Sequence, residues 1–248
     1  MKAIILAGGK GKRLNDEHND LPKALRQVHH KAMLDYVLDS ISFCDEIILV
    51  VGYKKDAIIE HTKRKYTYVL QTKQLGTGHA ALCAWPALHD YNGPVLIAFG
   101  DMPLCKEATY RELLRIHEEN MSDCTILSSV VNEEVPIPHY GRIIRDQNHQ
   151  IEYVKEEKDC SESEKQIREV NVGIMICDSQ KLFTCLKEVS NKNNQNEYYL
   201  TEVPEIMKRK GFKIVVHTIY DSDEIYGANT PEEIISLENI LKERQKND

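Results

Sequence analysis

Residues 1–14 of the chain are MKAIILAGGKGKRL, and this stretch decides the fold class. The apolar, β-branched run 3–6 predicts a buried strand. The strand leads directly into a turn of glycines and cations, which comprises Gly8, Gly9, Lys10, Gly11, Lys12 and Arg13. Glycine lets the backbone approach a ligand closely, and N–H groups beside Lys and Arg suit a polyphosphate. The opening therefore predicts a nucleotide-phosphate site.

The amino-acid sequence of this loop excludes two well-known phosphate-binding motifs. Walker A requires Ser or Thr after its Gly-Lys pair, whereas Arg13 follows Lys12 here. The dinucleotide-binding motif G-x-G-x-x-G requires a third glycine where this chain has Leu14. An ordinary strand-to-helix turn with solvated lysines remains the alternative interpretation.

Composition places the chain among ordinary globular proteins. Its 248 residues are 42% hydrophobic and 29% charged, which suits one large α/β domain with room for a small subdomain. A net charge of −7 argues against nucleic-acid binding. Seven cysteines without a C-x-x-C pair disfavour a disulfide framework and a cysteine zinc site. We therefore expect a cytoplasmic protein, without a membrane span or signal peptide.

Strand-like and helix-like segments alternate along the rest of the chain. Apolar runs such as 46–51 (EIILVV) and 95–99 (VLIAF) are typical of buried parallel strands. This alternation predicts a Rossmann-like, doubly wound, mostly parallel α/β sheet with helices on both faces. We expect strands at 2–7, 46–51, 66–70, 95–99, 123–131, 142–145, 151–155, 172–177 and 213–217, and helices at 22–42, 54–61, 78–88, 108–119, 181–188, 200–210 and from 231.

Distinctive residues follow several of these strands. Gln71 comes after 66–70, and Gly100 and Asp101 come after 95–99. Open α/β sheets bind ligands beyond the carboxyl ends of their strands, so these residues belong with the glycine turn. A carboxylate in this position is a common Mg²⁺ ligand near phosphates, although helix capping is the alternative role of Asp101.

Nine motifs, in order along the chain, resemble the sugar-1-phosphate nucleotidyltransferases. The sequences of these motifs are similar to those of the pyrophosphorylase (uridyltransferase) domain of bacterial N-acetylglucosamine-1-phosphate uridyltransferases. The motifs are LAGGKGKRL (6–14), LPKAL (21–25), QTKQLGTGHA (71–80), GDMPL (100–104), YGRI (140–143), EEKD (156–159), EVNVG (169–173), NEYYLTE (196–202) and GAN (227–229). The pair QTKQLGTGHA and GDMPL is far more specific than the glycine turn.

The resemblance implies a role for each matching residue. Arg13 and Lys23 would be catalytic, Gln71, Gly76 and Thr77 would contact uracil, and Asp101 and Asn229 would hold Mg²⁺. The nucleotide-binding set it implies is Leu6, Ala7, Gly8, Gly9, Lys10, Gly11, Arg13, Lys23, Gln71, Gly76, Thr77, Gly100 and Asp101, and the sugar-binding set is Gly141, Glu156, Asn171, Tyr199 and Thr201. Each of three residues has an alternative interpretation when it is taken alone. Lys23 could be a solvated surface lysine, Glu156 could belong to a solvated charged segment, and Asn229 could mark the start of a helix.

The resemblance also implies a domain plan and a reaction. Residues 1–229 would form the nucleotidyltransferase domain, 1–131 binding the nucleotide and 132–229 forming a small sugar-binding β subdomain, before a helix at 230–248. The reaction would join UTP and N-acetylglucosamine 1-phosphate to give UDP-N-acetylglucosamine and pyrophosphate, with Mg²⁺. The chain shows no hexapeptide repeats, so we expect no acetyltransferase half and a monomer or dimer.

Two alternatives remain open at this point. One is a cytidylyl- or uridylyltransferase for another phosphorylated sugar or alcohol of surface polysaccharide synthesis. The other is a nucleotide-sugar-binding regulatory protein without turnover. Two residues depart from the resembled motifs. Lys12 stands where Thr or Ser is more common, and Phe99 stands where Tyr is more common.

Overall fold

The structure, a computed structural model, describes residues 1–11, 14 and 21–247, so Lys12 and Arg13 lie outside the described residues. Within them the main sheet has the strand order β11-β7-β10-β6-β1-β4-β5, with β8 paired to β10 and β9 paired to β8. The strands are β1 (Lys2–Leu6), β4 (Glu46–Val51), β5 (Thr67–Leu70), β6 (Pro94–Phe99), β7 (Cys124–Val130), β8 (Arg142–Arg145), β9 (Ile151–Lys155), β10 (Glu169–Asp178) and β11 (Ile214–Ile219). β1 runs parallel to β4 and β6, β4 to β5, and β7 to β11, which confirms the predicted mostly parallel sheet.

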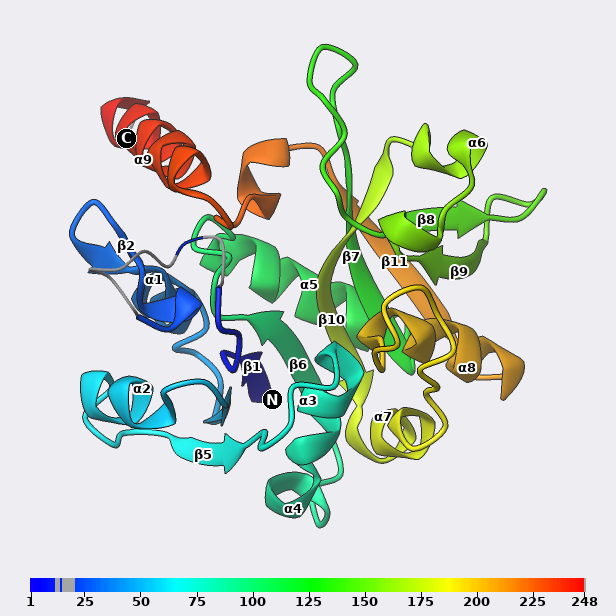
Figure 1. The fold of residues 1–248 in the computed structure, drawn as a ribbon. Helices are drawn as coiled ribbons and strands as arrows, with labels where there is room; N and C mark the ends of the chain where they lie inside the picture. Colours follow the sequence, from blue (N-terminus) through cyan, green and yellow to red (C-terminus); the bar gives the residue numbers. More distant parts are fainter. Residues whose placement is uncertain (12–13, 15–20, 248) are drawn as a thin grey trace.

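Helices cover both faces of this sheet because the central strands are apolar on both faces. In β1, Ala3 and Ile5 pack in one core cluster, whereas Ile4 and Leu6 pack in the other, as strand alternation requires. Helices α1 (Met33–Ser40), α2 (Lys55–His61) and α5 (Glu107–Glu119) contribute to the first cluster, and α3 (Thr77–Cys83), α4 (Trp85–Leu88), α7 (Ser179–Leu186) and α8 (Val203–Arg209) to the second. Figure 1 shows α3, α4 and α7 in front of the sheet and α5 behind it.

The order of the strands reverses direction between β1 and β6. The chain passes from β1 to β4 and β5 on one side, then returns to β6 on the other side of β1. The segments that follow β1 and β6 therefore diverge, and such a switch point leaves a crevice at the carboxyl ends of the strands.

The expected strand 172–177 is part of the longer, antiparallel strand β10. It pairs with both β6 and β7, and its register to β7 shifts between Asn171 and Met175. Gly173 lies inside this irregularity with φ +81°, a conformation that glycine adopts without strain. An alanine Cβ at this position would overlap the ring of Phe99.

The prediction of a helix over 22–42 is wrong for the first half of this segment. The segment forms a 3₁₀ turn, η1 (Lys23–Leu25), and a hairpin of β2 (Gln27–Val28) and β3 (Lys31–Ala32) before α1 begins. His29 and His30 have φ of +47° and +64°, which form a two-residue hairpin turn and cannot belong to an α-helix. Val28 lies in one buried cluster with Leu237 of the C-terminal helix α9 (Pro231–Asn247), and this long-range packing favours the hairpin.

Smaller differences concern segment boundaries. The helix expected at 78–88 is divided at Ala84 into α3 and α4. The helix expected at 200–210 comprises η3 (Leu200–Glu202) and α8, and the polar stretch 157–165 contains η2 (Glu157–Asp159) and α6 (Glu162–Lys165). One further 3₁₀ turn, η4 (Ser222–Ile225), precedes α9. The domain boundaries at 131 and 229 stay a prediction.

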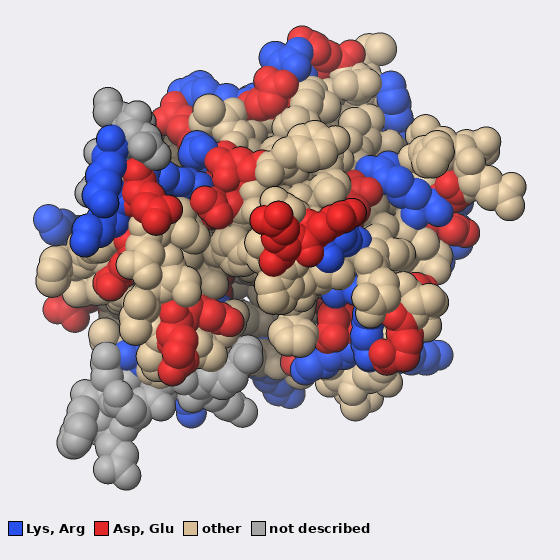
Figure 2. All heavy atoms as spheres, turned by 90° about the horizontal axis from the view of Figure 1, so that it is seen from above, with Lys and Arg blue, Asp and Glu red and all other residues tan. Residues whose placement is uncertain are grey.

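The surface carries charges of both signs. On the face seen from above, Lys and Arg side chains lie interspersed with Asp and Glu side chains (Figure 2). Among the described residues, none of the helices has the length and apolar character needed to cross a bilayer.

Removal of core volume in β6 tests the central position of this strand. Ile97 is fully buried between β1 and β10, so Ile97→Ala leaves a cavity in the middle of the sheet. We expect a loss of about 2–5 kcal/mol in the free energy of unfolding, measured by urea denaturation. The matched control is Ile235→Ala in α9, where the side chain is 57% exposed and we expect a loss of about 0.5 kcal/mol or less. Equal losses in the two variants would contradict the assignment of β6 as the core strand.

Candidate active site

The glycine turn after β1 is hydrogen-bonded to β4 and to the segments that follow β4 and β5. The N–H of Ala7 donates to Val50 O at 2.9 Å, and Gly8 O accepts from Tyr53 N at 3.2 Å and from Gln74 Nε2 at 2.7 Å. A Cβ at Gly8 would lie 3.1 Å from Gln71 Oε1, so glycine allows this close approach. These bonds therefore hold the turn at the carboxyl end of β1.

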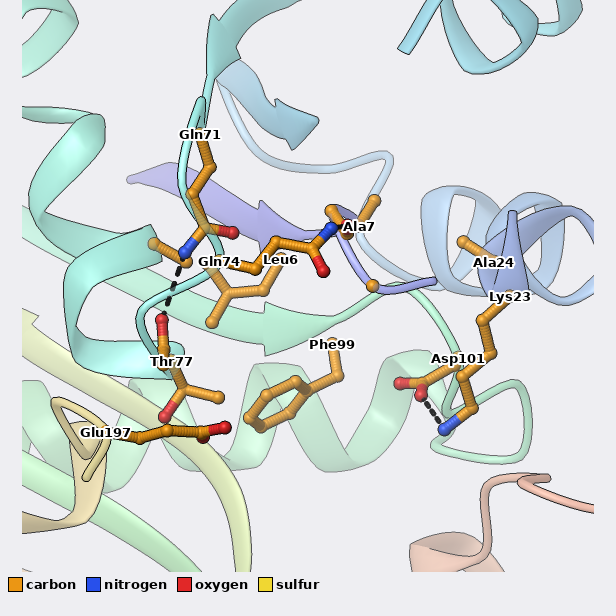
Figure 3. A pocket seen from close by; sticks show the side chains of 14 residues that line it. Leu6, Ala7, Lys23, Ala24, Gln71, Gln74, Thr77, Phe99, Asp101 and Glu197 are labelled. Carbon is orange, nitrogen blue, oxygen red and sulfur yellow. Dashed lines mark hydrogen bonds and ion pairs between the residues drawn. The ribbon is translucent and has the colours of Figure 1, made fainter. Parts of the chain in front are cut away.

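A cavity of about 310 Å³ opens beside this turn. Figure 3 shows Gln71, Gln74, Thr77 and Glu197 at one end, and Lys23 and Asp101 at the other, with Phe99 between them. The first end offers amide and backbone groups, which suit a base edge, together with the Glu197 carboxylate, whereas the second end carries the paired charges of Lys23 and Asp101. The full lining is Leu6, Ala7, Gly8, Gly9, Lys23, Ala24, Gln71, Gln74, Gly76, Thr77, Ala80, Phe99, Asp101 and Glu197. We call it the nucleotide cavity.

A second cavity, of about 240 Å³, adjoins the first. The two share Lys23, Thr77, Phe99 and Asp101, so the Lys23–Asp101 pair borders both cavities. Four of the predicted sugar-binding residues line it, namely Gly141, Glu156, Asn171 and Thr201, together with the predicted metal ligand Asn229. We call it the sugar cavity.

The sugar cavity presents hydrogen-bond acceptors. Asn171 is buried, and its Oδ1 has no hydrogen-bond partner in the described part of the chain. Buried polar atoms without a partner are rare in native proteins, so this oxygen is a candidate to accept from a ligand. Glu156 Oε1 accepts from Thr201 Oγ1 at 2.9 Å. Burial raises the pKa of Glu156, and the Thr201 hydroxyl partly opposes this shift.

One ammonium group connects the two cavities. Lys23 Nζ forms an ion pair with Asp101 and donates to Asn229 Oδ1 at 2.6 Å. These residues come from three distant segments, and a Cβ at Gly227 would lie only 2.6 Å from Asp101 O, so the segment before α9 packs closely on the end of β6. The Lys23 ammonium thus lies where a carboxylate and an amide oxygen converge.

The Asp101 and Asn229 oxygens fit a divalent cation. Mg²⁺ prefers oxygen ligands and is commonly held by one or two carboxylates, with phosphates and water completing its shell. The Lys23 ammonium already occupies this corner as a positive charge, which shows that the two oxygens accommodate a cation. No group of three or more His, Cys, Asp or Glu residues suited to a metal occurs within residues 1–11, 14 and 21–247.

Several predicted site residues lie away from the cavity lining. The Lys10 ammonium lies 5.0 Å from the centre of the Tyr53 ring, Gly11 packs on Lys23, and Gly100 packs behind the turn against Ala7. Tyr199 is buried, and its hydroxyl accepts from Gln195 Nε2 at 2.8 Å, outside the sugar cavity. Arg13 lies outside the described residues.

Other lining residues were missed by the sequence analysis. Gln74, Phe99 and Glu197 line the nucleotide cavity, and each lies inside or beside a motif already recognised. His139, Tyr140 and Gly173 line the sugar cavity. The motifs identified the segments that border the cavities. Which side chains of each segment face a cavity depends on the fold and could not be predicted from the motifs.

The amino-acid sequence is similar to a known family of domains and to several curated proteins. Residues 3–167 match the MobA-like NTP transferase domain. The chain is 38% identical over 245 residues to the bifunctional protein GlmU of Clostridium botulinum, and 40% identical over 245 residues to that of Clostridium beijerinckii. Each alignment covers 98% of this chain and 52% of the relative, so the chain spans about half the length of these curated relatives.

The fold is similar to a solved UDP-glucose pyrophosphorylase. The structure complexed with UDP-glucose aligns with a TM-score of 0.78 and 17% identity, over 98% of both chains. At this identity the likeness concerns the fold alone.

Replacement of Lys23 tests whether Asp101 and Asn229 form a cation site. Lys23→Met keeps the length of the side chain but frees both oxygens, so we expect Mn²⁺ to bind the nucleotide-free protein more tightly. A charge-assisted hydrogen bond is worth ~1.5–3 kcal/mol, which corresponds to about a tenfold gain or more. Water-proton relaxation measures this affinity. Lys31→Met is the control, because Lys31 pairs with the exposed Asp39 outside both cavities. Unchanged or weaker Mn²⁺ binding by Lys23→Met would exclude a cation site between these oxygens.

Proposed function

Because the chain belongs to the family of MobA-like NTP transferase domains, we propose that it is a uridylyltransferase that uses N-acetylglucosamine 1-phosphate. In this reaction UTP and the sugar phosphate give UDP-N-acetylglucosamine and pyrophosphate. The observation that carries the proposal is the pair of adjoining cavities with a shared charged end. The choice of N-acetylglucosamine rests on the nine ordered motifs.

The two cavities suit a direct transfer between two substrates. With the base near Gln71 and the sugar near Glu156 and Asn171, both substrates would direct their phosphates toward Lys23. A sugar-phosphate oxygen would attack the α-phosphorus of the nucleotide, and pyrophosphate would leave in line. Both reacting groups are already anionic, so the chemistry depends on positioning and charge neutralisation rather than on a general base.

Each residue of the charged end has a part in this proposal. The Lys23 ammonium would bind phosphate oxygens, and the backbone of Gly8 and Gly9 would allow the phosphates to approach closely. Asp101 and Asn229 would hold a divalent cation, proposed to be Mg²⁺, which supplies positive charge to the phosphates when bound. Arg13 would stabilise the charge on the departing pyrophosphate.

Measurement of pyrophosphate release tests the proposal. UTP, CTP, dTTP, ATP and GTP are each combined with several sugar 1-phosphates in the presence of Mg²⁺, with Asp101→Ala as the negative control. Release with UTP and N-acetylglucosamine 1-phosphate, and its loss in the control, would support the proposal. Release with a different pair would favour the alternative sugar or alcohol phosphate, and no release with any pair would favour a binding protein.

Replacement of Glu156 tests the sugar cavity. Glu156→Gln keeps the shape but replaces the carboxylate, whose oxygen would accept from a sugar hydroxyl, with a neutral amide. We expect the KM for the sugar phosphate to rise about tenfold or more, the scale of a hydrogen bond to a charged group, with less than a twofold change in the KM for UTP. Glu152→Gln on the exposed face of β9 is the matched control. Equal rises in both KM values would refute the assignment of Glu156 to the sugar.

A further inference from the structure

The side-chain amide of Gln71 has one forced orientation. Gln71 lies just after β5 with only 6% of its surface exposed, and its Nε2 donates to Gly76 O at 3.1 Å. A backbone carbonyl can only accept, so the NH₂ group must face Gly76. The amide oxygen is therefore turned away from Gly76 toward the nucleotide cavity (Figure 3), where it would lie 3.1 Å from a Cβ at Gly8.

His79 holds the second hydrogen of the same NH₂ group. Its Nδ1 lies 3.1 Å from Gln71 Nε2, and since that nitrogen donates, Nδ1 must accept. The ring is then neutral, with its proton on Nε2. Burial lowers the pKa of His79, in agreement with a neutral ring. The neighbouring groups are the Cys83 thiol, 4.0 Å from Nδ1, and the Tyr198 ring, 6.5 Å between centroids.

The nucleotide cavity is lined by Gln71 and by two residues that offer backbone donors. The N–H groups of Gly76 and Thr77 make no hydrogen bond within the described residues, and both residues line the nucleotide cavity. An acceptor and two donors in one cavity suit the edge of uracil, where the N3–H donor lies between two carbonyl oxygens. Cytosine has an unprotonated N3 and an amino group in place of O4, so it presents the opposite pattern at two positions.

We propose that His79 is a positioning residue for base selection: by accepting from the Gln71 amide, it keeps the glutamine oxygen directed at the base and so favours UTP over CTP. The inference rests on the proposed function, because it assigns the base to the nucleotide cavity. His79 is not itself among the residues that line this cavity. It acts through Gln71 by making the reversed amide, with its NH₂ toward the base, unfavourable.

The test compares three variants by their preference for UTP over CTP. His79→Ala removes the acceptor, so the reversed amide becomes more accessible. We expect the preference to fall roughly 2- to 12-fold, the effect of one neutral hydrogen bond. His79→Asn offers an oxygen near the position of Nδ1 and should retain the preference. His217→Ala, a partly buried histidine in β11 outside both cavities, is the control and should also retain it.

Equilibrium binding of UTP and CTP without sugar phosphate, by calorimetry, supplies the primary readout, and circular dichroism checks the folding of each variant. If His79→Ala loses affinity for both nucleotides equally, His79 supports the fold only and the proposal is overturned. Wild-type protein that prefers CTP would overturn it too. Wild-type protein that prefers UTP, with the preference lost in His79→Ala but without turnover, would support this inference and reject the proposed enzymatic function.

Discussion

The electrostatic pairing of Lys23 with Asp101 and Asn229 is the constraint on which the rest of the site depends. A carboxylate and an amide oxygen converge at the end of β6, and the Lys23 ammonium between them offsets part of the cost of removing the carboxylate from water. Both cavities open at this point, so one charged corner serves two ligands. The sheet supplies the rigidity, because its parallel strands end at one edge and bring distant loops together.

Much of the fold follows from the sequence, and family membership confirms the predicted enzyme class, a nucleotidyltransferase. Continuous apolar runs predicted the buried parallel strands because burial on both faces leaves little freedom in residue type. The hairpin at 27–32 was missed because its turn is formed by His29 and His30 rather than the usual glycine or asparagine. The antiparallel direction of β10 depends on strand partners that no local pattern encodes.

The candidate site shows the same division between local and long-range information. Motifs identified the segments near the cavities, whereas the direction of each side chain depends on packing. Tyr199 and Thr201 belong to one motif, yet Thr201 lines the sugar cavity and Tyr199 turns away from it. The wall formed by Phe99 depends on Gly173, since any larger residue there would displace the ring. The roles of individual residues in binding and catalysis stay predictions until they are measured.

The hydrogen bond between Lys23 and Asn229 spans 206 positions of the sequence, and this has a consequence for the order of events during synthesis. A growing polypeptide acquires the glycine turn, β1 and Lys23 early, and gains Asp101 midway. It lacks Asn229 until every strand described in the sheet has been made, because β11 precedes that residue. The charged corner is thus completed last, and a truncated translation product would contain the glycine turn and Asp101 without the second oxygen that closes the site.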